Sequence, residues 1–438
     1  MTTSSNEKQT STQLALVTYI SFFHKLEEEI QIIIQHWIRV LRIRLGWIQD
    51  FDKLIVDYVM FLFVNLFFIQ IIVDATTVLI LDSFSSSSKL INTFTGHTDP
   101  VLSIDFSVFD NNQLLCSASY DKTIRAWDVE TNQQIQLFSG HAGPVCCVKF
   151  SPYHYHNYHR NVICSSLGGK TIYFWDVKHN QQFQVFDEHN GWIGGIEFSP
   201  FNGGKYVCSG SWDKTIRLWD VETSKSLHIF KGHKNVVKCI DISPLQSNNN
   251  NNESNDIGVI GGNGYTICSG SCDNTIRIWD IETTKPLILF KGHENFVASV
   301  KYGSNELINT ILSGSWDKNA RLWDIRSGQQ IQIFNKHTNY VCAVEYSPFV
   351  IKNSDEIIDG NSKVICSGSD DNTIRFWDIR SNKKELYIIK GHKKDDGICC
   401  LKFIELKKKV KNNEQNLKNN GCINLFYGSG NGPIRVWG

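Results

Sequence analysis

The sequence predicts an all-β protein built from a tandem repeat, and three observations carry that prediction. Trp recurs seven times near the end of a short apolar run, and six of these are followed by Asp. A His precedes each Trp, with successive steps of 44, 48, 44, 60, 44 and 55 residues, so that 44 is the basic unit. Between turn residues of the types Gly, Pro, Asn and Asp, apolar and polar residues alternate with the period of antiparallel strands. The repeated residues are Trp127, Trp175, Trp219, Trp279, Trp323, Trp377 and Trp437, with His97, His141, His189, His233, His293, His337 and His392.

Each unit is predicted to contain four short strands in a fixed order. After the His comes an alternating stretch such as 236–242, which ends at a Ser-Pro turn. A second run such as 206–209 and a third such as 215–219 follow, and the third run carries the Trp. A last run such as 227–230 leads back to the next Gly-His. Four sequential strands joined by tight turns form one antiparallel sheet per unit.

This pattern resembles the WD-repeat β-propeller family from about residue 86 to residue 438. The resemblance implies a seven-bladed β-propeller of four-stranded antiparallel blades. It also implies a hydrogen-bonded chain in each blade, formed by the His, a Ser of the second strand, the Asp of the next turn and the Trp. Which Ser of each Ser-Gly-Ser takes part stays open. Five units carry the set: His97, Ser117, Asp121 and Trp127; His189, Ser209, Asp213 and Trp219; His233, Ser269, Asp273 and Trp279; His293, Ser313, Asp317 and Trp323; His337, Ser367, Asp371 and Trp377.

Units two and seven depart from the family pattern. Gly169 and Asn431 stand in place of the Asp, and Tyr427 stands in place of the Ser of unit seven. We expect these blades to be the softer ones, with His141 and His392 short of their usual acceptor.

The end of the chain predicts how the ring closes. Residue 438 follows directly on a third strand, so the seventh blade lacks a fourth. The segment 89–94 matches fourth-strand segments such as 135–138 and 331–334. Because an open blade would leave a strand edge unpaired, we expect the N-terminal segment to supply the missing strand.

The charge balance and the cysteine pattern limit the functions that the sequence predicts. The 44 basic and 44 acidic side chains balance, so no net charge favours nucleic acid, and we expect none to bind directly. The thirteen cysteines form no CxxC pair, and five recur just before a Ser, which favours a reducing compartment, cytoplasmic or nuclear. A phosphate loop, nucleophile elbow and metal-ligand cluster are missing from the sequence, so we expect no enzyme activity, cofactor, metal or small-molecule substrate.

The distribution of insertions predicts the binding face. Segments 153–160, 246–264, 350–363 and 405–421 all fall between first and second strands, at one end of the ring. The opposite rim, the top face, is built from the His loops and the Asp turns. Aromatic side chains in such turns are typical anchors for partner proteins, although each could instead pack on a neighbouring blade. The predicted anchors for peptide segments are Tyr120, Trp192, Trp212, Phe296, Trp316 and Tyr340.

Three other sequence patterns give weaker evidence for a functional site. His154, His156 and His159 lie on an insertion without a Cys or carboxylate partner, which disfavours a metal site. The lysines of 407–411 are typical of a solvated loop. The repeated His, Asp and Ser resemble a hydrolase triad, but five copies of one set indicate a structural role.

The N-terminal region is predicted to be separate from the propeller of 83–438. Residues 1–26 are mostly disordered by composition, and 27–57 has the periodicity of an amphipathic helical hairpin. The apolar segment 58–82 contains only sixteen uncharged residues in a row, 58–73, short of the roughly 20 that span a bilayer. Basic residues before it would also place the propeller on the far side of a membrane. Membrane anchorage, packing on the propeller and translated intron remain open for this segment.

These observations predict a non-catalytic scaffold or adaptor that presents a peptide-binding top face within a multiprotein complex. The alternatives are a membrane-anchored receptor, which depends on 58–82, and a substrate-recognition subunit of a ubiquitin ligase or chromatin-modifying complex.

Overall fold

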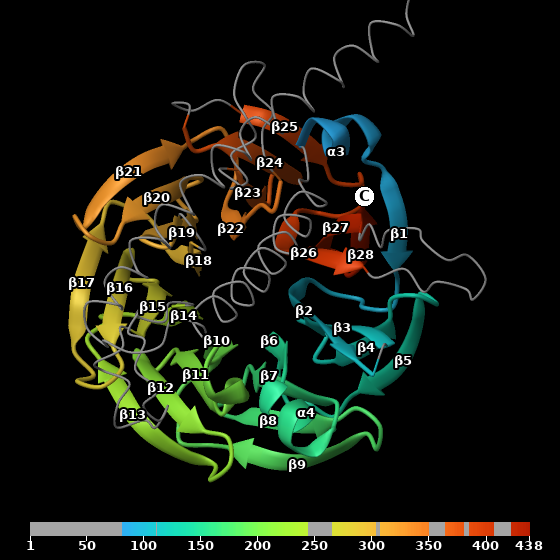
Figure 1. Ribbon diagram of the computed structural model, residues 1–438, viewed down its shortest axis with the longest axis vertical. Coiled ribbons are helices and arrows are strands. Elements are labelled where there is room, and N and C mark those ends of the chain that lie inside the picture. The colour runs from blue at the N-terminus through green and yellow to red at the C-terminus, as the bar shows by residue number, and fades with distance from the viewer. Residues whose placement is uncertain are drawn as a thin grey trace, which may run out of the picture. The chain divides into compact units, whose positions relative to one another are not determined.

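The protein is a seven-bladed β-propeller (Figure 1). The computed structural model describes residues 81–110, 112–243, 265–303, 307–349, 364–380, 385–406 and 422–438. Seven four-stranded antiparallel sheets stand around one axis, and each sheet is a blade. The predicted fold class and blade number are therefore confirmed.

The strands of blades 1 to 6 run from the axis outwards in chain order, and blade 7 differs only in having β1 as its outermost strand. Blades 1 to 4 are β2 (Val101–Phe109), β3 (Asn112–Ser119), β4 (Ile124–Asp128), β5 (Gln133–Phe138); β6 (Val145–Phe150), β7 (Val162–Leu167), β8 (Ile172–Asp176), β9 (Gln181–Phe186); β10 (Ile193–Phe198), β11 (Tyr206–Ser211), β12 (Thr215–Asp220), β13 (Lys225–Lys231); β14 (Val237–Ile242), β15 (Thr266–Ser271), β16 (Thr275–Asp280), β17 (Pro286–Lys291). Blades 5 to 7 are β18 (Val297–Tyr302), β19 (Thr310–Ser315), β20 (Ala320–Asp324), β21 (Gln329–Phe334); β22 (Val341–Tyr346), β23 (Val364–Ser369), β24 (Thr373–Asp378), β25 (Glu385–Lys390); β26 (Ile398–Leu406), β27 (Cys422–Ser429), β28 (Ile434–Trp437), β1 (Leu90–Phe94).

Burial explains why each strand has its composition. Second strands such as β11 and β19 are buried at every position, because a blade packs on each of their faces. Fourth strands such as β13 alternate exposed and half-buried residues, because they form the outer rim. The inner strands of neighbouring blades contact one another all the way around the axis. The core of the described residues consists of seven apolar clusters, one at each junction between adjacent blades.

The ring closes as predicted, with β1 as the fourth strand of blade 7. It pairs antiparallel with β28, and Phe94 lies opposite Ile434. Phe94 is buried, with its ring 5.4 Å from that of Trp127 in blade 1. Arg435 Nη1 donates a hydrogen bond to Thr93 Oγ1 at 3.1 Å. A strand from before blade 1 thus completes blade 7 and holds the two ends of the ring together.

Short helices occupy two places outside the blades. Helix α3 (Leu81–Ser87) buries Leu81 and Phe84, and the Phe84 ring stacks on Phe349 at 4.4 Å. Helix α4 (Pro152–Tyr158) folds most of the insertion that the sequence presents as a loop, with a 3-10 turn at η1 (Asn202–Gly204) beside it.

The chain divides into two compact units, Met1–Thr76 and Thr77–Gly438. The predictions for 1–26, 27–57 and nearly all of 58–82 lie outside the described residues, as do the insertions 246–264, 350–363 and most of 405–421. Within the part that is described, every helix is too short and too polar to cross a bilayer.

Candidate partner-binding site

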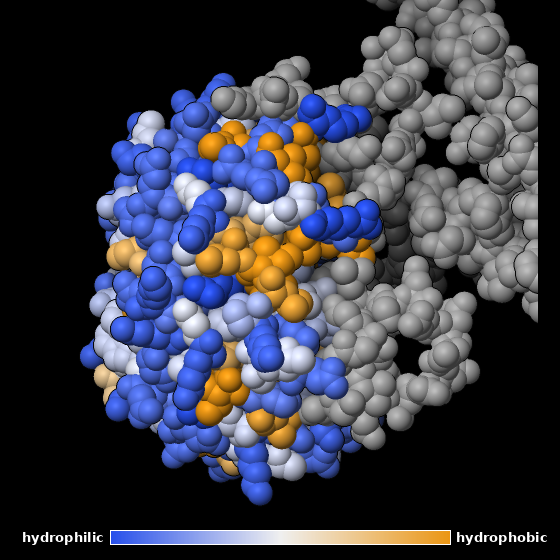
Figure 2. All heavy atoms as spheres, turned by 90° about the vertical axis from the view of Figure 1, so that its left-hand side faces the viewer, coloured by the Kyte–Doolittle hydropathy of each residue, from blue (hydrophilic) through white to orange (hydrophobic). Residues whose placement is uncertain are grey.

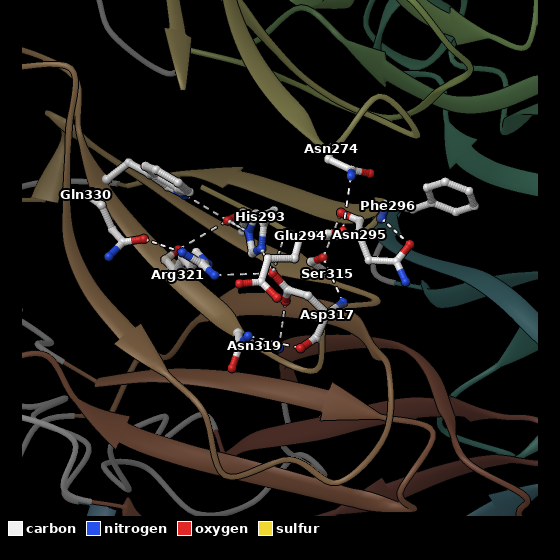
Figure 3. A network of polar contacts seen from close by, with 12 residues as sticks. Asn274, His293, Glu294, Asn295, Phe296, Ser315, Asp317, Asn319, Arg321 and Gln330 are labelled. Carbon is white, nitrogen blue, oxygen red and sulfur yellow. Dashed lines mark hydrogen bonds and ion pairs between the residues drawn. The ribbon is translucent and has the colours of Figure 1, made fainter. Parts of the chain in front are cut away.

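Five blades contain the same four-residue polar chain. In blade 5 the imidazole of His293 lies 2.7 Å from Asp317 through Nδ1 and 2.7 Å from Ser313 Oγ through Nε2, and Trp323 Nε1 donates to the same Oγ at 2.8 Å (Figure 3). Because the carboxylate only accepts, the geometry assigns the proton to Nδ1 and makes Nε2 the acceptor of the Ser hydroxyl. Equivalent contacts join the sets of blades 1, 3, 4 and 6.

The two serines of each Ser-Gly-Ser make different hydrogen bonds, as blade 5 illustrates. The first, Ser313, sits between His and Trp. The second, Ser315, donates to the Asn295 carbonyl at 3.0 Å and accepts the Asp317 N–H at 3.0 Å. The first Ser therefore joins strands within the blade, and the second fixes the turn of the top face.

This arrangement cannot work as a hydrolase triad in these five blades. The first Ser of each set is fully buried, and its oxygen accepts the Trp N–H. Burial also lowers the pKa of His97, His233 and His293, against the partner carboxylates that raise it. A nucleophile that no substrate can reach has a structural role.

Blade 2 lacks the chain. Trp175 Nε1 still donates to Ser165 at 3.1 Å, but His141 Nε2 has no hydrogen-bond partner. Burial lowers the pKa of His141 to about 4. Its ring instead packs edge-on against Trp175 with centroids 5.0 Å apart.

Blade 7 replaces the chain with a buried ion pair in which the side chain of His392 takes no part. His97 lies four residues before its inner strand and His392 six, so the longer loop leaves His392 exposed. Asp395 takes the vacant place. Its carboxylate, 0% exposed, accepts from Arg435 Nη2 at 2.6 Å and from the Tyr427 hydroxyl at 2.8 Å.

The top face is organised by one backbone hydrogen bond per blade. The residue before the Asp of the turn, or before Gly169 and Asn431 in blades 2 and 7, donates its N–H to the carbonyl of the residue before the inner strand, as Trp212 does to Trp192 at 2.7 Å. The side chains of these two positions are thereby held together. The Trp192 and Trp212 rings lie 4.8 Å apart, and those of Phe296 and Trp316 lie 5.3 Å apart.

These residues surround a cavity of about 740 Å³ at the top end of the axis. Tyr120, Trp192, Trp212, Phe296 and Trp316 line it, so five of the six predicted anchors meet in one place. Tyr340 is not among the lining residues; its ring stacks on Trp316 with centroids 4.8 Å apart. Tyr120 is 51% exposed, Trp212 49% and Trp192 37%, which leaves aromatic surface for a ligand.

The polar residues of this cavity were not predicted from the sequence. The Lys238 ammonium lies 4.5 Å from the Trp316 ring centre, and Asp370 and Asp396 lie on the wall of blades 6 and 7. Burial raises the pKa of Asp370, whose carboxylate accepts from the Cys342 thiol at 3.2 Å. Lys238 and Cys342 each occupy the second position of an inner strand. This shared position could have predicted from the sequence that both residues line the cavity.

Fold and site together define a repeat propeller with a ligand-sized opening in its top face. The chain belongs to the family described as WD domain, G-beta repeat, whose model matches residues 88–128, 132–176, 180–220, 224–280, 284–324 and 328–378. Propellers of this family generally act as scaffolds for protein interactions. The matched ranges end at residue 378, before β26–β28, which agrees with the altered polar chain of blade 7.

Individual relatives resemble the chain only over short stretches. It is 42% identical to F-box/WD repeat-containing protein 10 of Mus musculus over 55 residues, 13% of this chain and 5% of that protein. It is 33% identical to cell division control protein 4 of Saccharomyces cerevisiae over 138 residues, 30% and 18% of the two chains. It is 39% identical to pre-mRNA-processing factor 17 of Homo sapiens over 64 residues, 15% and 10%. The similarity thus spans less than a fifth of each relative.

Proposed function

We propose that this protein is a non-catalytic scaffold that binds extended segments of partner proteins in the top-face cavity, within a multiprotein complex. The observation that carries the proposal is the meeting of five aromatic side chains from blades 1, 3 and 5 around one opening. Aromatic anchors in a shared pocket typically dominate the energy of a protein interface. A cytoplasmic or nuclear setting fits the twelve free cysteines of the described residues.

The chemistry of the cavity supports a peptide rather than a flat protein surface. Trp192 and Trp212 form one aromatic wall, and Phe296 and Trp316 form another across blade 4. Lys238 lies between the walls, so the opening can hold apolar side chains and pair a polar group. A chain segment that crosses the opening would contact both walls at once.

The outer rim is the rival surface. Figure 2 views it from the side of β13, β17 and β21 and shows apolar patches separated by polar side chains. Leu287 is 56% exposed and Ile331 is 50% exposed there. Scattered exposed apolar residues are common on folded proteins, whereas the aromatic residues of the top face converge on a cavity.

Matched triple variants test the choice of surface. Trp192→Ala, Trp212→Ala and Phe296→Ala together remove the anchors, and Leu287→Ala, Leu289→Ala and Ile331→Ala remove as many exposed apolar side chains from the rim. Partners captured from cells that express the tagged full chain are identified and their affinities measured. We expect the first variant to lose at least about 2 kcal/mol of binding free energy, roughly 30-fold, and the second to bind as the parent. The opposite result would place the partner on the rim.

A further inference from the structure

A ring of seven charged side chains surrounds the axis below the cavity. In every blade the fifth residue of the inner strand is charged, although the neighbouring positions are mostly apolar. Because the inner strands of adjacent blades contact one another, these seven positions lie at one level. In blade order they are Asp105, Lys149, Glu197, Asp241, Lys301, Glu345 and Lys402.

The signs of these charges alternate around the ring with one exception. Lys149 Nζ lies 2.6 Å from Glu197, Lys301 Nζ lies 3.9 Å from Asp241, and Lys402 pairs with Asp105. Seven positions cannot alternate completely, because an odd ring must contain one pair of like neighbours. Here that pair is Glu197 and Asp241, of blades 3 and 4.

A comparison of Asp105 with Asp241 shows how neighbouring charges affect a carboxyl group at this position of the ring. Each accepts a backbone N–H from an adjacent blade at 2.8 Å, Asp105 from Phe150 and Asp241 from Tyr302. Asp105, however, lies between Lys402 and Lys149, whereas Asp241 lies between Lys301 and Glu197. The same residue type is thus held in the same way between two cations in one blade and between a cation and an anion in another.

The two carboxyl groups respond in opposite directions. Burial disfavours the charge of both. At Asp105, Lys402 and Lys149 outweigh burial and hold its pKa below the ordinary value. At Asp241, burial and the repulsion from Glu197 outweigh Lys301 and raise its pKa to about 6.

The other titratable groups around Asp241 do not change their charge in this pH range. Cys239 and Cys268 lie on β14 and β15, and burial raises the pKa of both thiols. The phenols of Tyr302 on β18 and Tyr346 on β22 are likewise shifted upward by burial. Lys149 on β6 stays protonated because its pKa is raised by acidic neighbours against the effect of burial. At Glu197, Lys149 and Lys301 outweigh burial and hold the pKa below its usual value. Asp241 is therefore the group at this junction that can change the charge of the ring under mildly acidic conditions.

We propose that the junction between blades 3 and 4 is a proton switch, in which Asp241 takes up one proton on mild acidification and the closed propeller is thereby stabilised. The proton converts the carboxylate to a neutral carboxyl group and removes the one pair of like-charged neighbours in the ring. It also changes the ring from a net charge of minus one to zero. This inference does not depend on the partner-binding proposal.

Thermal melting of the full chain tests the switch with two matched variants. Asp241→Asn and Asp105→Asn each retain an oxygen that can accept the backbone N–H. At pH 8 we expect the first to melt above the parent by about 2 °C or more and the second to melt below it. At pH 5 the advantage of Asp241→Asn should be about half as large, because the folded parent is then mostly protonated at this site while the unfolded chain is not, and it should vanish only below about pH 4. The deficit of Asp105→Asn should persist at pH 5.

Two results would overturn the proposal. One is an Asp241→Asn protein that melts below the parent at pH 8, as Asp105→Asn does, and the other is an advantage that is equal at pH 5 and pH 8. If Asp241→Asn does not fold, a carbon-13 titration of the carboxyl groups in the parent and in Glu197→Gln tests the proposal instead. A carboxyl that titrates near pH 6 in the parent and at lower pH in Glu197→Gln supports the switch, with the midpoint belonging to the coupled pair. The absence of any carboxyl titrating above pH 5 in the parent would contradict it.

Discussion

Blades 5 and 7 perform the same structural task with different chemistry. In blade 5, a neutral imidazole joins the top loop to the second and third strands through His293, Ser313 and Trp323, with Asp317 as its acceptor. In blade 7, the buried carboxylate of Asp395 makes the same connection by pairing with Arg435 and Tyr427. The position of the link is therefore fixed by the fold, while its chemistry can change.

The difference has an energetic consequence. Removing the Ser of blade 5 takes away hydrogen bonds between neutral groups and costs modest free energy, whereas removing the carboxylate of blade 7 leaves the Arg435 guanidinium without its counter-charge. Blade 7 also borrows its outer strand from the other end of the propeller. We therefore expect it to respond more strongly to mutation than blade 5.

The largest effect should come from removing the borrowed strand. Deletion of residues 86–95 takes away β1, so that β28 is left with an unpaired edge and Arg435 without Thr93. We expect aggregation or loss of the cooperative melt, measured by light scattering and calorimetry, because open edges recruit other chains. A deleted protein that melts like the parent would show that blade 7 does not need its fourth strand.

Breaking the ion pair should have the next largest effect. Asp395→Ala leaves the Arg435 guanidinium, 9% exposed, without its carboxylate. We expect a loss of about 3–5 kcal/mol in the free energy of unfolding, measured by denaturant titration. His392→Ala serves as the control and should change little, because His392 is exposed.

The matching change in blade 5 should cost less. Ser313→Ala leaves His293 Nε2 and Trp323 Nε1 without partners. We expect a loss of about 1–3 kcal/mol in the same titration. If Ser313→Ala costs more than Asp395→Ala, the contrast between the two blades is wrong.

The smallest effect should come from repairing blade 2. Gly169→Asp supplies the missing acceptor for His141, and we expect a gain of about 1 kcal/mol at pH 7. The pH dependence gives a second readout. Because the pKa of His141 is lowered to about 4, the unfolded chain binds a proton between about pH 6.5 and pH 4 that the folded protein does not, and the parent loses stability as the pH falls through this window. The new carboxylate should shrink that loss; an unchanged slope of stability against pH would show that the two side chains do not meet.

Much of the fold was predictable because each repeat specifies its own strands. The alternation within a unit, the recurring Trp and the match of 89–94 to other fourth strands were enough to predict seven closed blades. The role of Asp395 was not predictable, since two extra loop residues displace His392 and only the folded loop shows which side chain faces Arg435.

Contacts between blades were also hidden from the sequence. The charge of Asp241 looks like one polar position of an alternating strand, and only the packing of β14 on β10 brings it beside Glu197. Tyr340 was predicted to be an anchor from its place in the loop, yet its ring lies against Trp316 rather than on the cavity wall. Side-chain direction in a turn depends on neighbours that are distant in sequence.

The central claim is that partners bind the top face, and site-specific photocrosslinking in cells tests it most directly. The photoreactive residue p-benzoylphenylalanine replaces either Tyr120, an exposed aromatic residue of the cavity wall, or Leu287, an exposed residue of the outer rim. We predict that light joins partner proteins to the chain from position 120 and not from position 287. Crosslinks that form from position 287 alone would contradict a top-face binding site.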